Sequence, residues 1–398
     1  MFKSKVFLLG FVGVIDCFCN ISSTKAQNTI EIENKLDFPR SEIVSIPVSD
    51  LKFYLKKNKE SDLRIKDDNN KLLTLQWVDY DADGKNDELL FQVNIEAKKT
   101  NIYKIITDNK NPVPDTSVKA YSKLISENLD DYAWENDKVL FRIFGPKGQK
   151  EAEEKKKTGI LSSGIEIGFK KNEQPIITQW YQEYIKNPTA LLKNPKEEGF
   201  GLYEVGGSRG VGGTGVLVNN KLQVSKNFIT SKAIAEGSLR TIFEVTYFPW
   251  GDYKVGEKKR ISLDVGSNFS KIESTFESHS PAPNFTVGIA LHNNEGLAKL
   301  NDRSGYYLHW EKLDDNFVGE GLVLNPNIVQ KSFSNRTENP DESNLLVVTI
   351  PQNKLTYYAG FAWQKSGQIQ TMDDWEKMLQ KQAKIIANPL VAVFKSIK

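Results

Sequence analysis

The sequence predicts a mainly β protein in which antiparallel sheets pack face to face as a β-sandwich. Short segments that alternate apolar and polar residues recur along most of the 398 residues, as half-buried strands do. Gly, Pro, Asn and Asp separate these segments at short intervals, which favours hairpins. Amphipathic helical patterns do not alternate with the strands, so the crossover helices of a parallel sheet are not expected.

Residues 1–26 are typical of a secretion signal. Lys3 and Lys5 precede an apolar run, and small residues follow it. The run is too short to span a bilayer. The residues before Cys17 and Cys19 do not fit a lipid-anchored protein. We therefore expect a periplasmic or secreted protein without membrane insertion.

Removal of this signal changes the chemistry that the chain can offer. Both cysteines leave with it, which excludes a disulfide, a cysteine nucleophile and a thiolate metal site. The remaining charges balance, with 50 basic and 50 acidic residues. A neutral protein is a poor partner for nucleic acid or an anionic membrane.

The strands fall into two regions separated by a linker. Residues 27–108 form an N-terminal β region, and 109–116, which contain Pro112 and Pro114, form the linker. Residues 117–398 form the main β-sandwich domain, either as a separate unit or as one continuous domain with 27–108. The N-terminal strands are expected at 42–47, 72–78, 88–93 and 101–106.

The main domain contains most of the strands and ends in a helix. A capping box, Thr371-Met-Asp-Asp374, precedes apolar residues at helical spacing, which predicts a helix up to Asn388. The charged run 151–157 is expected to be a solvated loop. Strands are predicted at 139–144, 164–169, 213–218, 233–248, 259–265, 271–277, 285–292, 306–310, 345–350 and 356–363.

An Asp-rich segment is the sharpest local motif. Alternating carboxylates before a glycine are typical of calcium loops. Leu90 stands where an EF-hand has its bidentate glutamate. The segment is therefore either a structural Ca²⁺ site or a metal-free hairpin turn. Its candidate residues are Asp79, Asp81, Asp83, Lys85 and Asp87.

The chain has three histidines, and each is a candidate general acid or base. His292 follows a predicted strand and precedes two asparagines, a position where a side chain can face a ligand. His309 lies within a strand, and His279 lies in a loop. His292 is the preferred candidate, and a structural role is the alternative for each.

Further candidates surround two other motifs. Trp134-Glu135-Asn136 is followed by Arg142 on a strand, and the glycine-rich segment 206–213 contains Arg209, a guanidinium that suits a carboxylate. The same glycines also suit a flexible surface loop. Aromatic side chains at Trp180, Tyr181 and Tyr203 could stack on sugar rings, or could belong to the core.

These motifs, in this order, resemble a family of secreted proteins of unknown function encoded in bacterial polysaccharide-degradation loci, a family that includes ulvan oligosaccharide dehydratase. The resemblance covers most of residues 40–395. Where the family pattern places a Tyr-His pair, this chain has Tyr184-Ile185. The matching motifs are 134–146, 163–166, Trp180-Tyr181, 205–213 and 358–363.

The resemblance implies a supersandwich like that of sugar mutarotases, and removal of water from a non-reducing-end glucuronate or iduronate, without a catalytic cofactor. Such an elimination needs a group that neutralises the carboxylate, a base at C5 and an acid at the 4-hydroxyl. Arg209 or Arg142 suits the first role, His292 the second, and Tyr181 or Tyr203 the third. A polysaccharide lyase, a hydrolase and a non-catalytic carbohydrate-binding protein remain alternatives, all with an acidic oligosaccharide as partner.

Overall fold

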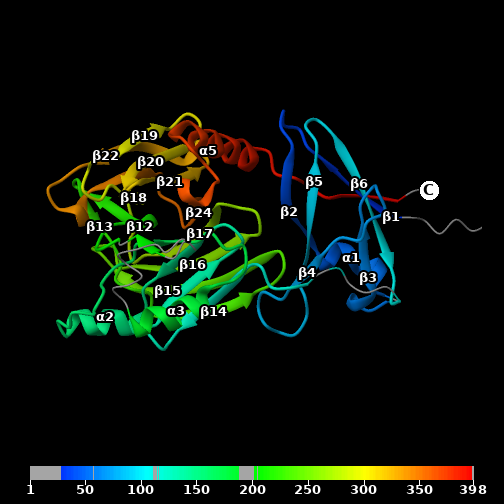
Figure 1. Cartoon of the computed structure of the whole chain (residues 1–398), viewed down its shortest axis with the longest axis horizontal. Coiled ribbons are helices and arrows are strands. Elements are labelled where there is room, and N and C mark those ends of the chain that lie inside the picture. The colour runs from blue at the N-terminus through cyan, green and yellow to red at the C-terminus, as the bar shows by residue number, and fades with distance from the viewer. Residues whose placement is uncertain are drawn as a thin grey trace, which may run out of the picture.

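The computed structural model describes residues 28–396 apart from 57, 111–113, 115, 188–200 and 204. The predicted signal 1–26 and part of the predicted linker lie outside the described residues. The fold is mainly β with antiparallel sheets and a C-terminal helix, as predicted. Figure 1 shows a smaller lobe, which contains the N-terminal strands, beside a larger lobe.

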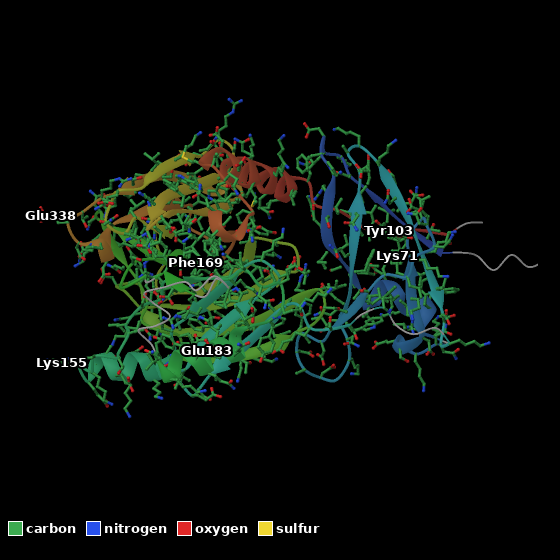
Figure 2. The ribbon with its side chains drawn as sticks, viewed as in Figure 1. Lys71, Tyr103, Lys155, Phe169, Glu183 and Glu338 are labelled. Carbon is green, nitrogen blue, oxygen red and sulfur yellow. The ribbon has the colours of Figure 1, made fainter. Side chains whose placement is uncertain are left out.

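The smaller lobe is built from two sheets and helix α1 (Val48–Leu55), which share one apolar core. In Figure 2, Tyr103 lies within this lobe. One sheet has the order β25 (Val393–Ser396), β1 (Asn28–Glu33), β6 (Thr100–Thr107), β3 (Leu63–Lys66), and the other β2 (Arg40–Pro47), β5 (Glu88–Ile95), β4 (Leu75–Val78). Since β25 pairs with β1, the end of the chain belongs to this lobe. The division at 109–116 as a domain boundary stays a prediction.

The larger lobe is organised around an eight-stranded antiparallel sheet. Some of its strands alternate in burial, as in β16, where every second side chain from Val255 to Leu263 is buried, whereas β20 and β21 are buried on both faces over most of their length. The strand order is β14 (Thr230–Ala235), β15 (Arg240–Trp250), β16 (Val255–Asp264), β17 (Phe269–Glu277), β24 (Lys354–Trp363), β21 (Asn316–Leu324), β20 (Tyr306–Leu313), β19 (Leu297–Asn301).

Two five-stranded sheets cover the inner face of this long sheet and share its largest core. Phe169, which Figure 2 places inside the larger lobe, belongs to that core. One sheet runs β13 (Lys221–Gln223), β12 (Val211–Val218), β18 (Phe285–Ala290), β23 (Asn344–Thr349), β22 (Val329–Asn335), and the other β11 (Gly201–Tyr203), β10 (Glu166–Phe169), β9 (Leu140–Ile143), β8 (Asp131–Glu135), β7 (Tyr121–Ile125).

Helix α5 (Met372–Ala387) covers the outer face of the long sheet at β20 and β21 (Figure 1). The predicted capping box is present, since Thr371 and Asp374 exchange hydrogen bonds. Trp375 is fully buried against Gly319 and Gly321 of β21. The helix therefore supports the strands that carry the site described below.

Two local predictions were wrong, and one helix had not been predicted. Residues 233–248 are two strands rather than one, because the chain turns at Gly237 between β14 and β15. Helix α2 (Pro146–Glu153), which begins with proline at its first turn, takes up part of the predicted loop 151–157. Helix α3 (Ile177–Lys186) packs Trp180 and Tyr181 on the β7–β11 sheet. Short 3₁₀ helices lie at Glu60–Asp62, Pro326–Ile328, Pro340–Glu342 and Gln364–Ser366.

The two lobes contact each other through a small apolar cluster. Val78 and Leu90 of the smaller lobe pack with Leu239 and Ile242 of the larger one. The Gln76 side chain also bonds the backbone of Leu239, with a distance of 2.9 Å. Among the described residues, no helix is long and apolar enough to cross a membrane.

The contact between α5 and β21 can be tested with Gly319→Ala. A Cβ at Gly319 would lie 2.5 Å from Trp375 Cδ1, and overpacking of this kind costs about 1–3 kcal/mol. We expect the midpoint of urea unfolding to fall. Gly256→Ala is the matched control, because its Cβ would meet nothing closer than 3.7 Å. Equal midpoints for the two variants would contradict the tight packing.

Candidate functional site

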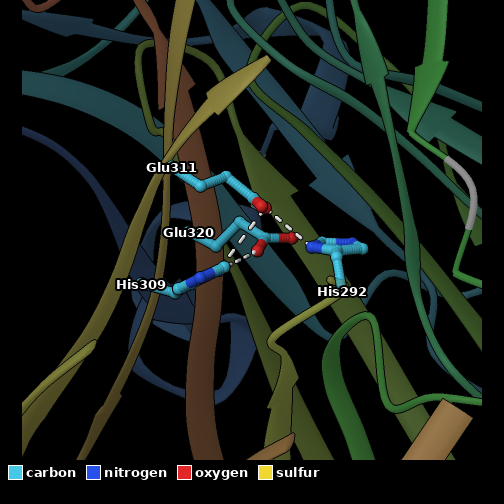
Figure 3. Close-up of side chains that lie close together, drawn as sticks. All are labelled: His292, His309, Glu311 and Glu320. Carbon is cyan, nitrogen blue, oxygen red and sulfur yellow. Dashed lines mark hydrogen bonds and ion pairs between the residues drawn. The ribbon is translucent and has the colours of Figure 1, made fainter. Parts of the chain in front are cut away.

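Four ionisable side chains converge within the larger lobe (Figure 3). They are His292, His309, Glu311 and Glu320, and one ligand-type atom from each lies within 4.8 Å of the others. We call them the His–Glu cluster. His292 follows β18, whereas the other three belong to the hairpin of β20 and β21.

Strand geometry explains why the hairpin residues meet. His309 and Glu311 are two residues apart on β20, so their side chains point to the same face. Glu320 pairs directly with His309 in the antiparallel register of β21, and directly opposed side chains lie close together. This face is the buried inner face of the long sheet, because Tyr307 and Leu322 on the same strands belong to the main core.

The closest contact in the cluster joins His292 and Glu311. Their Nδ1 and Oε1 atoms are 2.6 Å apart, although neither atom has a well-aligned hydrogen bond among the described residues. His309 Nδ1 lies 3.5 Å from Glu311 Oε1 and 3.3 Å from Glu320 Oε2. Glu311 therefore connects the two imidazoles.

Burial sets the protonation tendencies of the cluster. Burial raises the pKa of Glu320 to about 8. The charge of His292 opposes this rise, and the negative charge of Glu311 adds to it. Burial also lowers the pKa of His309, against the charge of Glu311. For Glu311, burial would raise the pKa, but the contact and charge of His292 and the charge of His309 outweigh it and lower the pKa.

Tyr203 and His292 form the part of the site nearest to solvent. The Tyr203 ring, carried by β11, lies with its centroid 4.0 Å from that of the His292 ring. Burial raises the pKa of Tyr203, and the carboxylates of Glu311 and Glu320 raise it further. His292 has φ of 44°, in the left-handed region that few non-glycine residues adopt. Such strain is concentrated at functional sites.

An open hollow of about 670 Å³ adjoins His292. Arg336 lines it and is exposed. Its guanidinium donates to the carbonyl oxygens of Asn294 and Gly296, at 2.5 and 2.9 Å. The hollow therefore combines a cation and an imidazole. Its other lining residues are Asn293, Asn294, Thr337, Glu338 and Pro340.

Arg209 is not the available guanidinium that the glycine-rich motif suggested. It is 2% exposed, and it donates to Ser163 Oγ and to the carbonyl oxygens of Thr214 and Gly207. Burial lowers the pKa of Arg209 to about 10. Its bonds hold the 206–213 segment together, so its role is structural.

Arg142 is likewise committed to protein partners. It pairs with Glu166 and with Asp131, whose Oδ2 lies 3.3 Å from the arginine. Tyr181, predicted as an acid, donates to Asp131 from within the core. Arg142 and Tyr184 line a second hollow, of about 620 Å³, but it does not include His292. Arg142, its ion-pair partners and the second hollow are thus separate from the His–Glu cluster.

The other predicted substrate-binding residues are buried and support the fold. Trp134 and Trp180 are core side chains. Glu135 pairs with Lys170 at 2.7 Å and accepts the backbone N–H groups that begin α3. Asn136 closes the turn before β9 and bonds the carbonyl oxygen of Asp264. Their burial corrects the expectation that they face a substrate.

The Asp-rich segment forms an exposed turn between β4 and β5. Asp79, Asp81 and Asp87 approach one another closely enough to hold a cation. However, their carboxylates already accept backbone N–H groups within the turn. Asp83 pairs with Lys85 at 3.1 Å. A calcium ion at this position stays a prediction.

His292 and Tyr203 were both candidates from the sequence, and the structure brings their rings into contact, whereas Glu311, Glu320 and Arg336 were not among the candidates. One local signal was available for Glu311. The spacing His309-Trp-Glu311 within a strand places two chemically active side chains on one face. Glu320 required the hairpin register, and Arg336 required the position of the loop after β22.

These features define the class of the protein: a β-sandwich protein whose packed sheets bring a His–Glu cluster to the edge of an open hollow. The chain belongs to the family described as Domain of unknown function (DUF4861), whose model matches residues 32–392. It is 36% identical over 393 residues to "Uncharacterized protein P7" of Formosa agariphila, and the match covers 97% of this chain and 98% of that protein.

Two solved structures from Enterococcus faecalis are also similar. One is an alpha-mannosidase and the other a protein in Glycosyl Hydrolase Family 38. Each is 11% identical in sequence to this chain and superposes on it with a TM-score of 0.46. Each match covers 93% of this chain. The chain spans 46% and 47% of their respective lengths, about half of each.

The structural role of Glu135 gives a test. Glu135→Gln leaves the Lys170 charge buried without a counter-ion, which typically costs about 3–5 kcal/mol. We expect the free energy of unfolding in urea to fall by that order. Glu173→Gln removes the same charge from an exposed position and should change little. A stable Glu135→Gln protein with weakened oligosaccharide binding would instead favour a substrate-binding role.

Proposed function

We propose that this protein is exported and eliminates water from the non-reducing-end uronate of an acidic oligosaccharide, such as an ulvan fragment, to give a 4,5-unsaturated uronate. The observation that carries the proposal is the close, tilted contact of the Tyr203 ring with His292, which together with Arg336 lines an open hollow. The family resemblance to ulvan oligosaccharide dehydratase gives the same reaction.

Arg336 is the group proposed to neutralise the uronate carboxylate. A guanidinium has five N–H donors and binds carboxylates well. Two of these donors hold the Asn294 and Gly296 carbonyl oxygens and so fix the orientation of the guanidinium. Neutralisation of the carboxylate makes the neighbouring C5 proton more acidic. Arg336 replaces the buried Arg209 and Arg142 in this role.

His292 is the proposed base. Its Nδ1 lies against Glu311 Oε1, and its Nε2 is buried and has no hydrogen-bond partner among the described residues, so the ring must turn toward the hollow to meet a substrate. Neutral imidazole can therefore take the C5 proton at Nε2 while Glu311 orients the ring and stabilises the resulting charge. The electron pair of the broken C5–H bond forms the C4–C5 double bond.

Tyr203 is the proposed acid. A tyrosine phenol is protonated near neutral pH, as a proton donor to the 4-hydroxyl group must be. When the C4–O bond breaks, this proton leaves with the hydroxyl as water, because hydroxide alone is a poor leaving group. The proton held by His292 then returns to the tyrosinate through the contact between the two rings or through solvent, and the cycle closes.

The activity is tested by incubating the purified protein with glucuronate- and iduronate-ended oligosaccharides. We expect a product that weighs one water less than the substrate, with ultraviolet absorbance from the new double bond and an unchanged chain length. Shorter chains with the same absorbance would identify a polysaccharide lyase. Binding without any product would identify a carbohydrate-binding protein.

The roles of individual residues are tested with His292→Ala. General acid–base catalysis contributes about 10²–10⁴-fold, so turnover should fall by at least about a hundredfold. His279→Ala is the matched control, because His279 is exposed. A His292→Ala protein with wild-type turnover would exclude His292 as the base.

Tyr203→Phe and Arg336→Met separate the other two roles. The first removes only the phenolic proton and should lower kcat with little effect on KM. The second removes the carboxylate clamp and should raise KM as well as lower kcat. Measurement of both constants by the ultraviolet assay checks this difference, and a Tyr203→Phe protein with unchanged kcat would exclude Tyr203 as the acid.

A further inference from the structure

Among the described residues, the carboxylates of the His–Glu cluster face two imidazoles rather than a lysine or an arginine. Glu311 is 5% exposed and Glu320 is 2% exposed. Within the described part of the chain, neither forms an ion pair with a lysine or arginine, and the two histidines are their only basic partners. Two buried carboxylates without a cation are expensive, and proteins resolve this by pairing, protonation or metal binding.

A second buried cluster on the same sheet shows how the fold satisfies charge elsewhere. Glu257 pairs with Lys259 at 2.8 Å. The Thr214 hydroxyl donates to Glu257 and accepts from Lys259, with distances of 2.9 and 2.7 Å. Each charged group there has well-formed protein partners. The His–Glu cluster differs, since buried Glu311 Oε1 has no well-aligned hydrogen bond among the described residues.

The distances around His309 match those of metal ligands better than those of hydrogen bonds. Two ligands bound tetrahedrally to zinc at 2.0–2.1 Å are about 3.4 Å apart. His309 Nδ1 lies 3.3 Å from Glu320 Oε2 and 3.5 Å from Glu311 Oε1. Good hydrogen bonds to nitrogen are about 2.9–3.0 Å. The three ligand atoms lie within 4.8 Å of one another, and Glu311 Oε1 is a buried oxygen without a well-aligned hydrogen bond among the described residues.

We propose that His309, Glu311 and Glu320 form a site for a divalent cation of the zinc class. One imidazole with two carboxylates suits zinc and its neighbours in the first transition series. Two carboxylates balance a charge of +2, so the occupied site is neutral. Three protein ligands leave an open position that water or a substrate oxygen can take.

His292 is assigned to the surroundings of the metal rather than to its ligands. Its 2.6 Å contact with Glu311 Oε1 has the length of a hydrogen bond and is shorter than the separation of two zinc ligands. Oε1 has two lone pairs, so a bound cation can take one and leave the other on the side of His292, whose ring needs only a small rotation to align its N–H with it. Ligating carboxylates are commonly held by such a partner. The cation would then fix Glu311, and through it the orientation of His292.

The hairpin is well suited to hold a metal. All three ligands come from β20 and β21, which pair continuously and are supported from the outer face by α5. A fully buried Trp375 bonds the backbone carbonyl of Glu320 at 3.0 Å. Rigid elements hold ligand geometry better than loops do. The inference does not depend on which sugar the protein acts on.

The test is calorimetric titration of the chelator-treated mature protein with Zn²⁺, without substrate. We expect one tight site per chain. Glu320→Gln should weaken binding at least a hundredfold while the apo fold keeps or gains stability, because an uncompensated buried charge is removed. His292→Ala should bind Zn²⁺ within about threefold of the wild type. Absence of a tight site, or equal affinity in Glu320→Gln, would overturn the proposal.

Two controls keep the outcome interpretable. An Asp79→Asn, Asp81→Asn double variant should retain the tight site, and its loss there would show that the Asp-rich turn holds the ion. If Glu320→Gln does not fold, the visible absorbance of Co²⁺ in the wild type replaces it, since a strong four-coordinate spectrum supports the site and a weak six-coordinate one contradicts it. Binding is read without turnover, so a zinc-loaded but inactive protein refutes only the proposed dehydration.

Discussion

Charge on the buried inner face of the eight-stranded sheet is the constraint on which the candidate site depends. Two sheets cover this face, so any ionised group on it is removed from water. Glu257 and Lys259 form an ion pair on this face, and both bond the Thr214 hydroxyl. At Glu311 and Glu320 the fold provides two imidazoles and the edge of an open hollow. The second arrangement keeps ionisable side chains next to a space that a ligand can enter.

The position of the cluster follows from the arrangement of the layers. The β20–β21 hairpin supplies three members and is held by α5 on its outer face. His292 arrives from the opposite sheet, just after β18, and Tyr203 arrives from the β7–β11 sheet. Three sheets therefore meet at one site. His292 has a left-handed backbone at this meeting point.

Sequence patterns predicted the strands better than they predicted the site. Alternation along β5, β6 and β24 is a local property, and so is the capping box at Thr371. The contact of Glu320 with His309 depends on register, which one strand alone does not specify. Arg209 and Trp134 lie in motifs that are typical of ligand-binding segments. Both side chains are buried, because other parts of the fold cover these segments, and the sequence does not show which segments are covered. His292 was identified because histidines are few.

The central claim is that the hollow beside His292 is where a uronate is bound and changed. A crystal structure of the Tyr203→Phe variant with a glucuronate-ended disaccharide tests this most directly. The account predicts the uronate ring in this hollow, with its carboxylate on Arg336 and its C5 atom toward His292 Nε2. A disaccharide in the hollow lined by Arg142 and Tyr184, with the His292 hollow empty, would contradict it.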